Sequence, residues 1–444
     1  MKYVSTRGGP GVTLDAALLE GIAPDGGLYL PEQLPRFSLD DFSDANDLLA
    51  IAKRYLRPFF QGSQLAGELD DILDETFSFD IPTTPIKVAQ GSAQLLELFH
   101  GPTAAFKDVG AGFLAACISR LNTVSPEADS QALLTILVAT SGDTGGAVAA
   151  AFDGRPGIRV VILYPDGRVS ERQAQQLTCW GDNVQSLAVQ GSFDDCQRLV
   201  KSAMADPKLN SRHRFSSANS INIGRLLPQS IYYADASLRH YRATGRKPGF
   251  IIPTGNLGNA FACIMARESG LPVGDIILVT NANALIGDYL QGAQWQSRPS
   301  IQTLASAMDV GDPSNMERLR KLMGEGPELN QVVRVFSASD QDIENEIKNA
   351  FTEYGLTICP HTATASYAYH QLSDDERSNA DWILVATAHA AKFESIVEPL
   401  IGEIIPLPKG LSDIMSRPSR FTRIEPDLKS LQTQLDLVPV TGDK

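Results

Sequence analysis

The stretch "LLTILVATSGDTGGAVAAAF", residues 133–152, joins an apolar run to an alanine-rich segment through a short turn that contains glycine. A continuous apolar run of this length is typical of a β-strand that is buried on both faces. The segment "GGAVAAAF" after the turn is typical of a helix. The stretch therefore predicts a strand, a loop and a helix in succession, which is the repeating unit of a parallel α/β sheet.

The same succession recurs along the rest of the chain. Further buried strands are predicted at 158–165, 184–191, 248–254, 275–281, 332–339 and 381–389. Most of them precede a segment with helical character, and Ser192 is the expected N-cap of the helix in "SFDDCQRLVKSAMAD". Because fully apolar strands alternate with helices, we expect parallel sheets that are covered by helices on both faces.

The alternation of strands and helices divides the chain into three predicted parts. Residues 1–80 do not follow it, because they are rich in acidic and helix-forming residues, and we expect them to form an N-terminal lobe. Residues 128–212 are assigned to a small α/β domain, and residues 81–127 together with 213–444 to a large one. The segment after "IIPLPKG" has weak periodicity and is expected to wrap the surface.

Composition excludes several classes of function. The net charge of −14 argues against a nucleic-acid or membrane partner, so any anionic ligand must be held by a local site. No apolar run approaches the roughly 20 residues that span a bilayer, and the start of the chain lacks the apolar core of a secretion signal. We therefore expect a cytoplasmic enzyme. Neither disulfides nor a metal site is expected from the scattered cysteines, which are Cys117, Cys179, Cys196, Cys263 and Cys359.

Two loops are placed where parallel sheets bind ligands. "ATSGDTGGA", residues 139–147, and "PTGNLGNAF", residues 253–261, each follow a predicted strand and precede a predicted helix. Helix N-termini at that edge point backbone N–H groups at anions, and glycines let the backbone approach a phosphate. Neither loop has the Walker or dinucleotide spacing. Taken alone, each loop is more typical of an ordinary turn between a strand and a helix than of a ligand site.

The segment "HGPTAAFKDVG", residues 100–110, adds a third feature. Lys107 opens a predicted helix among small apolar residues, where partial desolvation would lower its pKa and free the amine to act as a nucleophile. The alternative is a surface lysine paired with Asp108. A nucleophilic lysine followed by two glycine loops favours an enzyme that uses pyridoxal 5'-phosphate, because this cofactor needs an amine for its aldehyde and a cradle for its phosphate.

The chain resembles the threonine synthase family, which belongs to fold type II of the pyridoxal-phosphate enzymes. The likeness runs from "YVSTRG" near the start to "TAHAAKF" near residue 393. Seven segments carry it: "APDGGLYLP" (23–31), "FHGPTAAFKD" (99–108), "ATSGDTGGAV" (139–148), "SINIGRLLPQ" (220–229), "PTGNLGN" (253–259), "DVGDPSNMERL" (309–319) and "PHTATA" (360–365). The resemblance implies two parallel-sheet domains with the cofactor between them, plus an N-terminal lobe. It also implies conversion of O-phospho-L-homoserine and water to L-threonine and phosphate.

The resemblance assigns roles to the residues of these segments. Lys107 matches the lysine that bonds to the cofactor aldehyde and moves protons. Thr362 matches the hydroxyl that meets the pyridine nitrogen, with Thr364 as the alternative. The cradle for the cofactor phosphate matches Gly255, Asn256, Leu257, Gly258 and Asn259. The loop for the substrate's α-carboxylate matches Ser141, Asp143 and Thr144; because another family branch has Asn at position 143, backbone amides and hydroxyls are better candidates there than the Asp143 side chain.

"SINIGRLLPQ" is the expected site for the substrate's own phosphate. Ser220, Asn222 and Arg225 would offer a hydroxyl, amides and a guanidinium at the start of a helix predicted from about residue 222. The alternative is a capping serine with a solvated arginine. We expect structural roles for His100, His361 and His389, an architectural role for "DVGDPSNMERL", and no regulation by S-adenosylmethionine, which belongs to the other branch.

Three other functions remain open from the sequence. A related phospholyase would stop at elimination and release 2-oxobutyrate with ammonia. A serine or threonine dehydratase of the same fold would not need the phosphate site of "SINIGRLLPQ". A nucleotide-binding protein could have both glycine loops but would leave Lys107 unexplained.

Overall fold

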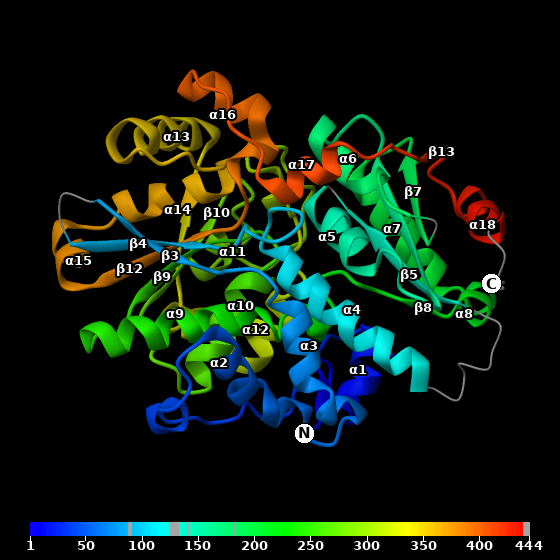
Figure 1. The fold of residues 1–444 in the computed structure, drawn as a ribbon, viewed down its shortest axis with the longest axis horizontal. Coiled ribbons are helices and arrows are strands. Elements are labelled where there is room, and N and C mark those ends of the chain that lie inside the picture. The colour runs from blue at the N-terminus through cyan, green and yellow to red at the C-terminus, as the bar shows by residue number, and fades with distance from the viewer. Residues whose placement is uncertain (88–90, 125–132, 141, 182, 438–444) are drawn as a thin grey trace.

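The computed structural model describes residues 1–87, 91–124, 133–140, 142–181 and 183–437. Figure 1 shows a large domain built on one sheet, a small domain built on a second sheet, and an N-terminal lobe packed along one side of both. Among the described residues, no helix combines the length and the hydropathy that crossing a bilayer requires.

The N-terminal lobe holds its short elements together through a cluster of aromatic rings. Tyr55 contacts both Phe37 and Phe59, with ring centroids 5.3 and 5.4 Å apart. Its helices pack against the rest of the chain, α2 on α9 and α3 on α4. The elements of the lobe are β1 (Tyr3–Ser5), α1 (Leu14–Glu20), β2 (Tyr29–Pro31), η1 (Leu39–Phe42), α2 (Leu48–Leu56), η2 (Arg57–Phe60), η3 (Gln64–Gly67) and α3 (Leu69–Thr76).

The large domain contains a six-stranded sheet in the order β11-β10-β9-β12-β4-β3. All neighbouring strands are parallel except β3, which runs antiparallel at the edge. Every residue of the central strands β9, β10 and β12 is buried, which confirms the prediction made from their apolar runs. The strands are β3 (Thr83–Ile86), β4 (Ser92–Glu97), β9 (Gly249–Pro253), β10 (Ile276–Thr280), β11 (Arg334–Ser337) and β12 (Asp381–Ala386).

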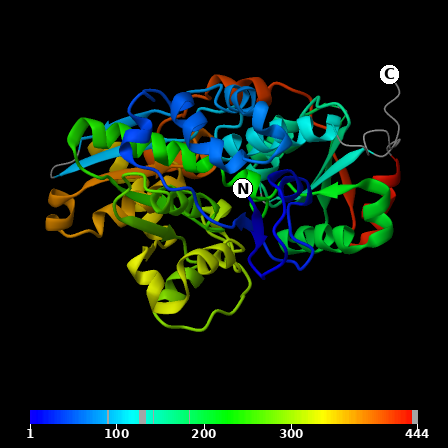
Figure 2. The ribbon, with the colours of Figure 1, turned by 90° about the horizontal axis from the view of Figure 1, so that it is seen from below.

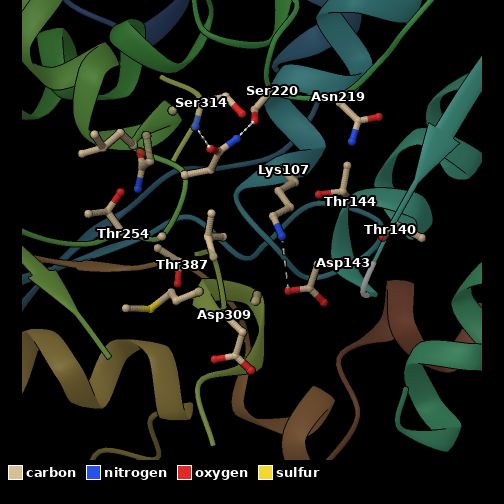
Figure 3. A pocket seen from close by; sticks show the side chains of 18 of the residues that line it. Lys107, Thr140, Asp143, Thr144, Asn219, Ser220, Thr254, Asp309, Ser314 and Thr387 are labelled. Carbon is tan, nitrogen blue, oxygen red and sulfur yellow. Dashed lines mark hydrogen bonds and ion pairs between the residues drawn. The ribbon is translucent and has the colours of Figure 1, made fainter. Parts of the chain in front are cut away.

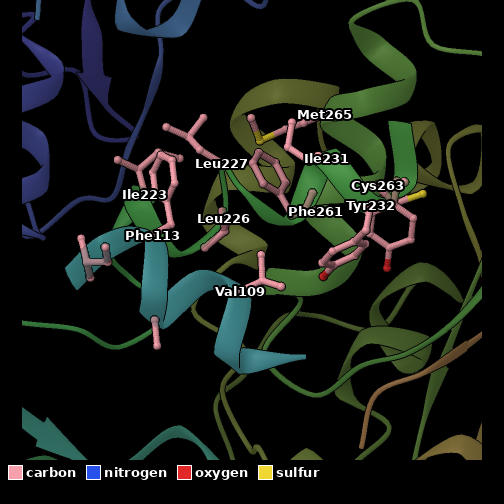
Figure 4. Packing of buried hydrophobic residues seen from close by; sticks show 14 of the residues in the cluster. Val109, Phe113, Ile223, Leu226, Leu227, Ile231, Tyr232, Phe261, Cys263 and Met265 are labelled. Carbon is pink, nitrogen blue, oxygen red and sulfur yellow. The ribbon is translucent and has the colours of Figure 1, made fainter. Parts of the chain in front are cut away.

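Helices cover both faces of this sheet. Figure 4 shows Val109 and Phe113 of α4 packed toward apolar residues of the segment before α9 and of α9 and α10, among them Leu226 and Phe261. These contacts fix the first turn of α4, where Lys107 stands. The helices of the large domain are α4 (Lys107–Val124), η5 (Ile223–Arg225), α9 (Gln229–Thr244), α10 (Gly258–Glu268), α11 (Leu285–Leu290), η6 (Ser306–Met308), α12 (Met316–Met323), η7 (Gly326–Gln331), α13 (Asp340–Tyr354), α14 (Pro360–His370), α15 (Asp374–Asn379), η8 (Ala390–Phe393), α16 (Glu394–Ile401) and α17 (Lys409–Met415).

The small domain contains a five-stranded parallel sheet in the order β13-β7-β6-β5-β8. All residues of β5 and β6 are buried. Ser192 caps α7 as predicted, with its hydroxyl accepting from the Asp195 amide. The elements are β5 (Leu134–Ala139), α5 (Asp143–Phe152), β6 (Ile158–Pro165), α6 (Glu171–Thr178), β7 (Val184–Val189), α7 (Phe193–Ala205), α8 (Pro207–His213), β8 (Phe215–Ser216), β13 (Thr422–Ile424) and α18 (Leu428–Leu437).

The predicted domain boundaries need two corrections. Residues 213–444 do not all belong to the large domain, because β8 pairs with β5 and β13 pairs with β7 of the small sheet. Residues 422–437 thus return to the small domain, as Figures 1 and 2 show for the red segment. Leu431 and Leu435 of α18 are fully buried in the core of that domain. A strand of three residues with two exposed side chains gives no periodic signal, so the sequence pattern missed it.

Candidate active site

The two glycine loops and Lys107 meet in one cavity between the domains. It is lined by Ala139 and Thr140 at the end of β5, by Pro253 and Thr254 at the end of β9, and by Thr387 just after β12. These are the carboxyl ends of parallel strands, where ligands of α/β proteins bind. Figure 3 shows Lys107 extending into this cavity toward Asp143.

Lys107 is the first residue of α4, and its side chain is 15% exposed. Burial lowers the pKa of its amine to about 8; Asp143 opposes this shift, whereas the charges of Lys392 and Arg225 add to it. The amine lies 4.0 Å from Asp143 Oδ2. The alternative pairing with Asp108 is not present, because Asp108 is buried and accepts from the amide and hydroxyl of Thr103. The neutral fraction of the Lys107 amine near neutral pH is therefore far larger than that of an exposed lysine, which favours a role as a nucleophile.

The second glycine loop has the form of an anion cradle. It precedes α10, and Leu257 adopts the left-handed conformation with φ 60°. Gly255 has no room for a side chain, since a Cβ there would lie 2.7 Å from the Cα of Met308. Within the described part of the chain, the amides of Gly255, Asn256 and Leu257 have no acceptor. Free amides at a helix N-terminus fit a phosphate.

Asn259 supplies an unpaired donor to the same place. It is 3% exposed, and its Oδ1 accepts from the hydroxyls of Tyr232 and Tyr233 at 2.6 and 2.8 Å. Because the oxygen faces the two tyrosines, Nδ2 faces the other way; Asn259 lines the cavity, and Nδ2 has no partner among the described residues. A buried N–H group without an acceptor is rare in proteins, and a phosphate oxygen would satisfy it.

Asn256 and Ser220 join the cradle to "SINIGRLLPQ". Asn256 Nδ2 donates to Ser220 Oγ at 2.6 Å, and Asn256 Oδ1 accepts from the Ser314 amide at 2.6 Å. Both Asn256 and Ser220 line the cavity. The segment "DVGDPSNMERL" was expected to have an architectural role. In keeping with this, Arg318 near its end is fully buried and donates to the carbonyls of Tyr29 and Ser220.

Arg225 is the buried cation of the cavity. Its guanidinium donates to the carbonyl oxygen of Ala218 and, at 3.5 Å, to that of Lys107, while Nε has no partner among the described residues. Burial lowers the pKa of Arg225 to about 10. Among the described residues, no carboxylate lies within ion-pair distance of it. The alternative of a solvated arginine is therefore wrong.

Asn222 does not line the cavity, contrary to the prediction. Its side chain is fully engaged, donating to the carbonyls of Leu18 and Ser217 at 2.8 and 3.1 Å and accepting from the Gly224 amide at 3.0 Å. It caps a short 3₁₀ helix, Ile223–Arg225, and the longer helix expected from residue 222 begins only at Gln229. Asn222 thus ties the segment to the N-terminal lobe.

Thr362 is also placed differently from the prediction. Its hydroxyl lies 3.3 Å from Cys359 Sγ, and the Thr364 hydroxyl donates to the His361 carbonyl at 2.8 Å. Neither threonine is among the residues that line the cavity, whereas Thr387 and His361 are. Thr387 was not among the predicted site residues, although it lies near the end of the strand predicted at 381–389, at the edge of the sheet where ligands bind.

The three histidines are engaged by the protein. His361 Nε2 accepts from the Ala307 amide at 3.0 Å, and burial lowers its pKa to about 4. His389 Nδ1 accepts from the Ala391 amide, and His100 pairs with Glu97 at 2.7 Å. His361 and His389 thus each accept a hydrogen bond from a backbone amide, in keeping with structural roles.

The first glycine loop brings Asp143 and Thr144 to the cavity at the start of α5. Ser141 lies outside the described residues. Burial raises the pKa of Asp143, but the charges of Lys392 and Lys107 outweigh burial and hold that pKa well below its usual range. Lys392, 2.9 Å from Asp143 Oδ1, is a second residue that the sequence analysis missed.

Comparisons with known proteins show the family of the chain. Residues 89–388 match the family described as pyridoxal-phosphate dependent enzyme, residues 2–77 match the threonine synthase N terminus, and residues 362–435 match the threonine synthase C-terminal family. The chain is 35% identical over 425 residues to the threonine synthase of Escherichia coli K12, covering 95% of this chain and 96% of that protein. It is 36% identical over 426 residues to that of Buchnera aphidicola from Acyrthosiphon pisum, covering 96% of each.

Solved structures give the same result. The threonine synthase of Escherichia coli superposes with a TM-score of 0.86 at 32% identity, covering 98% of this chain and 99% of that one. The PLP-bound threonine synthase of Brucella melitensis superposes with a TM-score of 0.88 at 34% identity, covering 98% of each. The lysine, the anion cradle and the match over nearly the whole length agree, and the chain belongs to the threonine synthase family of pyridoxal-phosphate-dependent enzymes of fold type II.

Proposed function

We propose that this chain acts in the cytoplasm on O-phospho-L-homoserine and water and releases L-threonine and phosphate. The observation that carries the choice of substrate is the presence of two groups of unpaired donors in one cavity. One group is the loop 255–257 with Asn259, and the other is the Arg225 guanidinium, whose Nε has no partner among the described residues. A cofactor phosphate needs only one of them, so the second is free for a phosphate on the substrate.

We assign the cofactor to residues that fit it. Lys107 would hold its aldehyde carbon, and the loop 255–259 would hold its phosphate. Thr387, whose side chain lines the cavity, is a better candidate than Thr362 for the ring nitrogen. A hydroxyl at that position would not keep the ring nitrogen fully protonated. When bound, the cofactor withdraws electrons from the substrate's α-carbon and so acidifies the proton there.

The chain's own residues would then move the protons and hold the charges. Lys107, freed when the substrate amine takes its place, accepts the proton from Cα. Amides at the start of α5, with the hydroxyl of Thr144, bind the substrate's carboxylate. Arg225 and Ser220 hold the phosphate as it leaves Cγ. A proton leaves Cβ, another is added at Cγ, the hydroxyl of water adds to Cβ, and a proton returns to Cα, while the remaining proton of the water is released with the phosphate. One C–O bond at Cγ thus breaks and one forms at Cβ.

Product identity tests this proposal against the phospholyase and the dehydratase. The purified protein, loaded with pyridoxal phosphate, is given O-phospho-L-homoserine, and phosphate, threonine, 2-oxobutyrate and ammonia are quantified together. We expect phosphate and threonine in equal amounts, with 2-oxobutyrate as a minor by-product. Phosphate accompanied mainly by 2-oxobutyrate and ammonia would establish a phospholyase. Turnover of L-serine or L-threonine without turnover of the phosphorylated substrate would establish a dehydratase.

A further inference from the structure

Lys392 is a fully buried lysine next to the active site. Its side chain is 0% exposed, and its ammonium lies 2.9 Å from Asp143 Oδ1 and donates to the Thr103 carbonyl at 2.7 Å. Lys392 stands on η8 of the large domain, whereas Asp143 opens α5 of the small domain. The ion pair therefore joins the two domains next to Lys107.

Asp143 is shared between two lysines. Oδ1 faces Lys392 at 2.9 Å, and Oδ2 faces Lys107 at the longer distance of 4.0 Å. The carboxylate thus makes its short contact with Lys392. An opposite charge within about 4 to 6 Å favours the charged form of an amine, and a second cation nearby disfavours it. The shared arrangement therefore limits how strongly Asp143 can hold Lys107 as an ammonium.

Lys392 also reaches Lys107 through the backbone. The Thr103 carbonyl accepts from Lys392, while the amide and hydroxyl of Thr103 donate to Asp108. Asp108 follows Lys107 in the first turn of α4. The chain of contacts from Lys392 through Thr103 to Asp108 fixes the start of the helix that carries Lys107.

Other charged groups around Lys107 cannot replace this contact. Arg225 approaches from η5 and repels an ammonium, and His361 on α14 is held neutral by burial. Asp108, on the same helix as Lys107, is occupied by Thr103. Within the described part of the chain, Asp143 is thus the only carboxylate within ion-pair distance of the Lys107 amine.

We propose that Lys392 is a positioning residue for Lys107. It partly neutralises the carboxylate of Asp143 and holds the Thr103 carbonyl by a hydrogen bond, so that the Lys107 amine lies near a carboxylate without forming a close ion pair with it. The proposal rests on the role proposed above for Lys107 as the group that accepts the Cα proton. Without Lys392, the whole charge of Asp143 would act on Lys107, which would stay protonated to higher pH and would accept protons more slowly.

The experiment compares holoenzymes that carry Lys392→Met, Lys392→Arg and the exposed control Lys348→Met. For each, kcat and KM are measured against pH with O-phospho-L-homoserine, and exchange of the Cα hydrogen of L-threonine in D2O is followed by NMR. For Lys392→Met we expect the acid limb of kcat and of the exchange rate to shift to higher pH by about one unit. At a pH below the limb, both rates should therefore be about tenfold lower than those of the wild type. KM should change by less than about threefold, because the substrate's phosphate is held elsewhere. Lys392→Arg keeps the charge and should retain the wild-type limb, as should Lys348→Met.

Different outcomes separate this role from a structural one. If Lys392→Met lowers kcat equally at all pH values, and the acid limb stays in place, Lys392 only supports the fold and the proposal fails. Should Lys392→Met not fold, Asp143→Asn gives the second reading: the acid limb should move to lower pH, and an unmoved limb overturns the proposal. If the wild-type protein makes no threonine, the substrate proposal is wrong, while the exchange reaction, which needs no phosphorylated substrate, still tests Lys392.

Discussion

The hydroxyls of Tyr232 and Tyr233 decide which way the Asn259 amide faces. Both donate to Asn259 Oδ1, so that Nδ2 is left as the donor on the cavity side. The double substitution Tyr232→Phe with Tyr233→Phe removes both hydroxyls and keeps both rings. The ring of residue 233 should keep its edge contact with Phe250, where the centroids are 5.2 Å apart. The perturbation is therefore confined to the two hydrogen bonds to Asn259 and to the one from the Tyr232 hydroxyl to Gln229 Oε1 at 3.2 Å.

The size of the effect follows from what is left unpaired. Asn259 Oδ1 would lose both donors in a buried place, which costs about 1 to 3 kcal/mol in the free energy of unfolding. The amide would also lose the orientation that aims Nδ2 at the phosphate. A hydrogen bond to a charged group contributes about 1.5 to 3 kcal/mol, so its loss raises the cofactor dissociation constant about tenfold to a hundredfold.

The assay is titration of the cofactor-free protein with pyridoxal phosphate, followed by absorbance, beside urea unfolding of the same samples. Tyr241→Phe on the same helix is the matched control, because the Tyr241 hydroxyl has no hydrogen-bond partner in the described structure. We expect weaker cofactor binding for the double variant alone. A lower free energy of unfolding with unchanged cofactor affinity would refute the reasoning, since the two hydroxyls would then serve only the core.

Two further substitutions test the cavity. Lys107→Ala should abolish turnover and the visible absorption of the lysine-bound cofactor, because among the described residues no other lysine lines the cavity; an active variant with a normal spectrum would remove Lys107 from the reaction. Arg225→Met should raise KM for O-phospho-L-homoserine by about one to two decades and leave cofactor affinity unchanged, since one charge-assisted contact contributes about 1.5 to 3 kcal/mol. Isothermal titration with the cofactor decides the second case: a collapse of cofactor affinity with unchanged KM would assign Arg225 to the cofactor phosphate instead.

The sequence predicts the strands and loops of this fold well, because burial on both faces leaves a continuous apolar run. β6, Ile158–Pro165, is present over the eight residues predicted for it. The two glycine loops and Lys107 also meet as expected, since the carboxyl ends of parallel strands share one edge of a sheet.

The direction of individual side chains is less predictable. All residues of Pro360–Ser366 in α14 are buried, so no polar face marks which of Thr362 and Thr364 would look toward the cavity. In the structure neither is among the residues that line the cavity. The pair of Lys392 and Asp143 has no local signal either, because its members are far apart in the sequence and meet only when the two domains pack.

The charges around the cavity explain how so acidic a chain could bind two phosphates. Two buried guanidiniums, those of Arg225 and Arg318, have no carboxylate within ion-pair distance among the described residues, and burial lowers the pKa of both. Burying an unpaired charge is costly, so such groups persist where carbonyls or ligand anions compensate them. Arg318 is compensated by carbonyls, including that of Ser220, whereas Arg225 keeps Nε free. Charges on the outer surface are screened beyond about 8 to 10 Å, so the net charge of −14 has little effect there. Local positive potential, rather than net charge, would therefore decide whether Arg225 binds an anion.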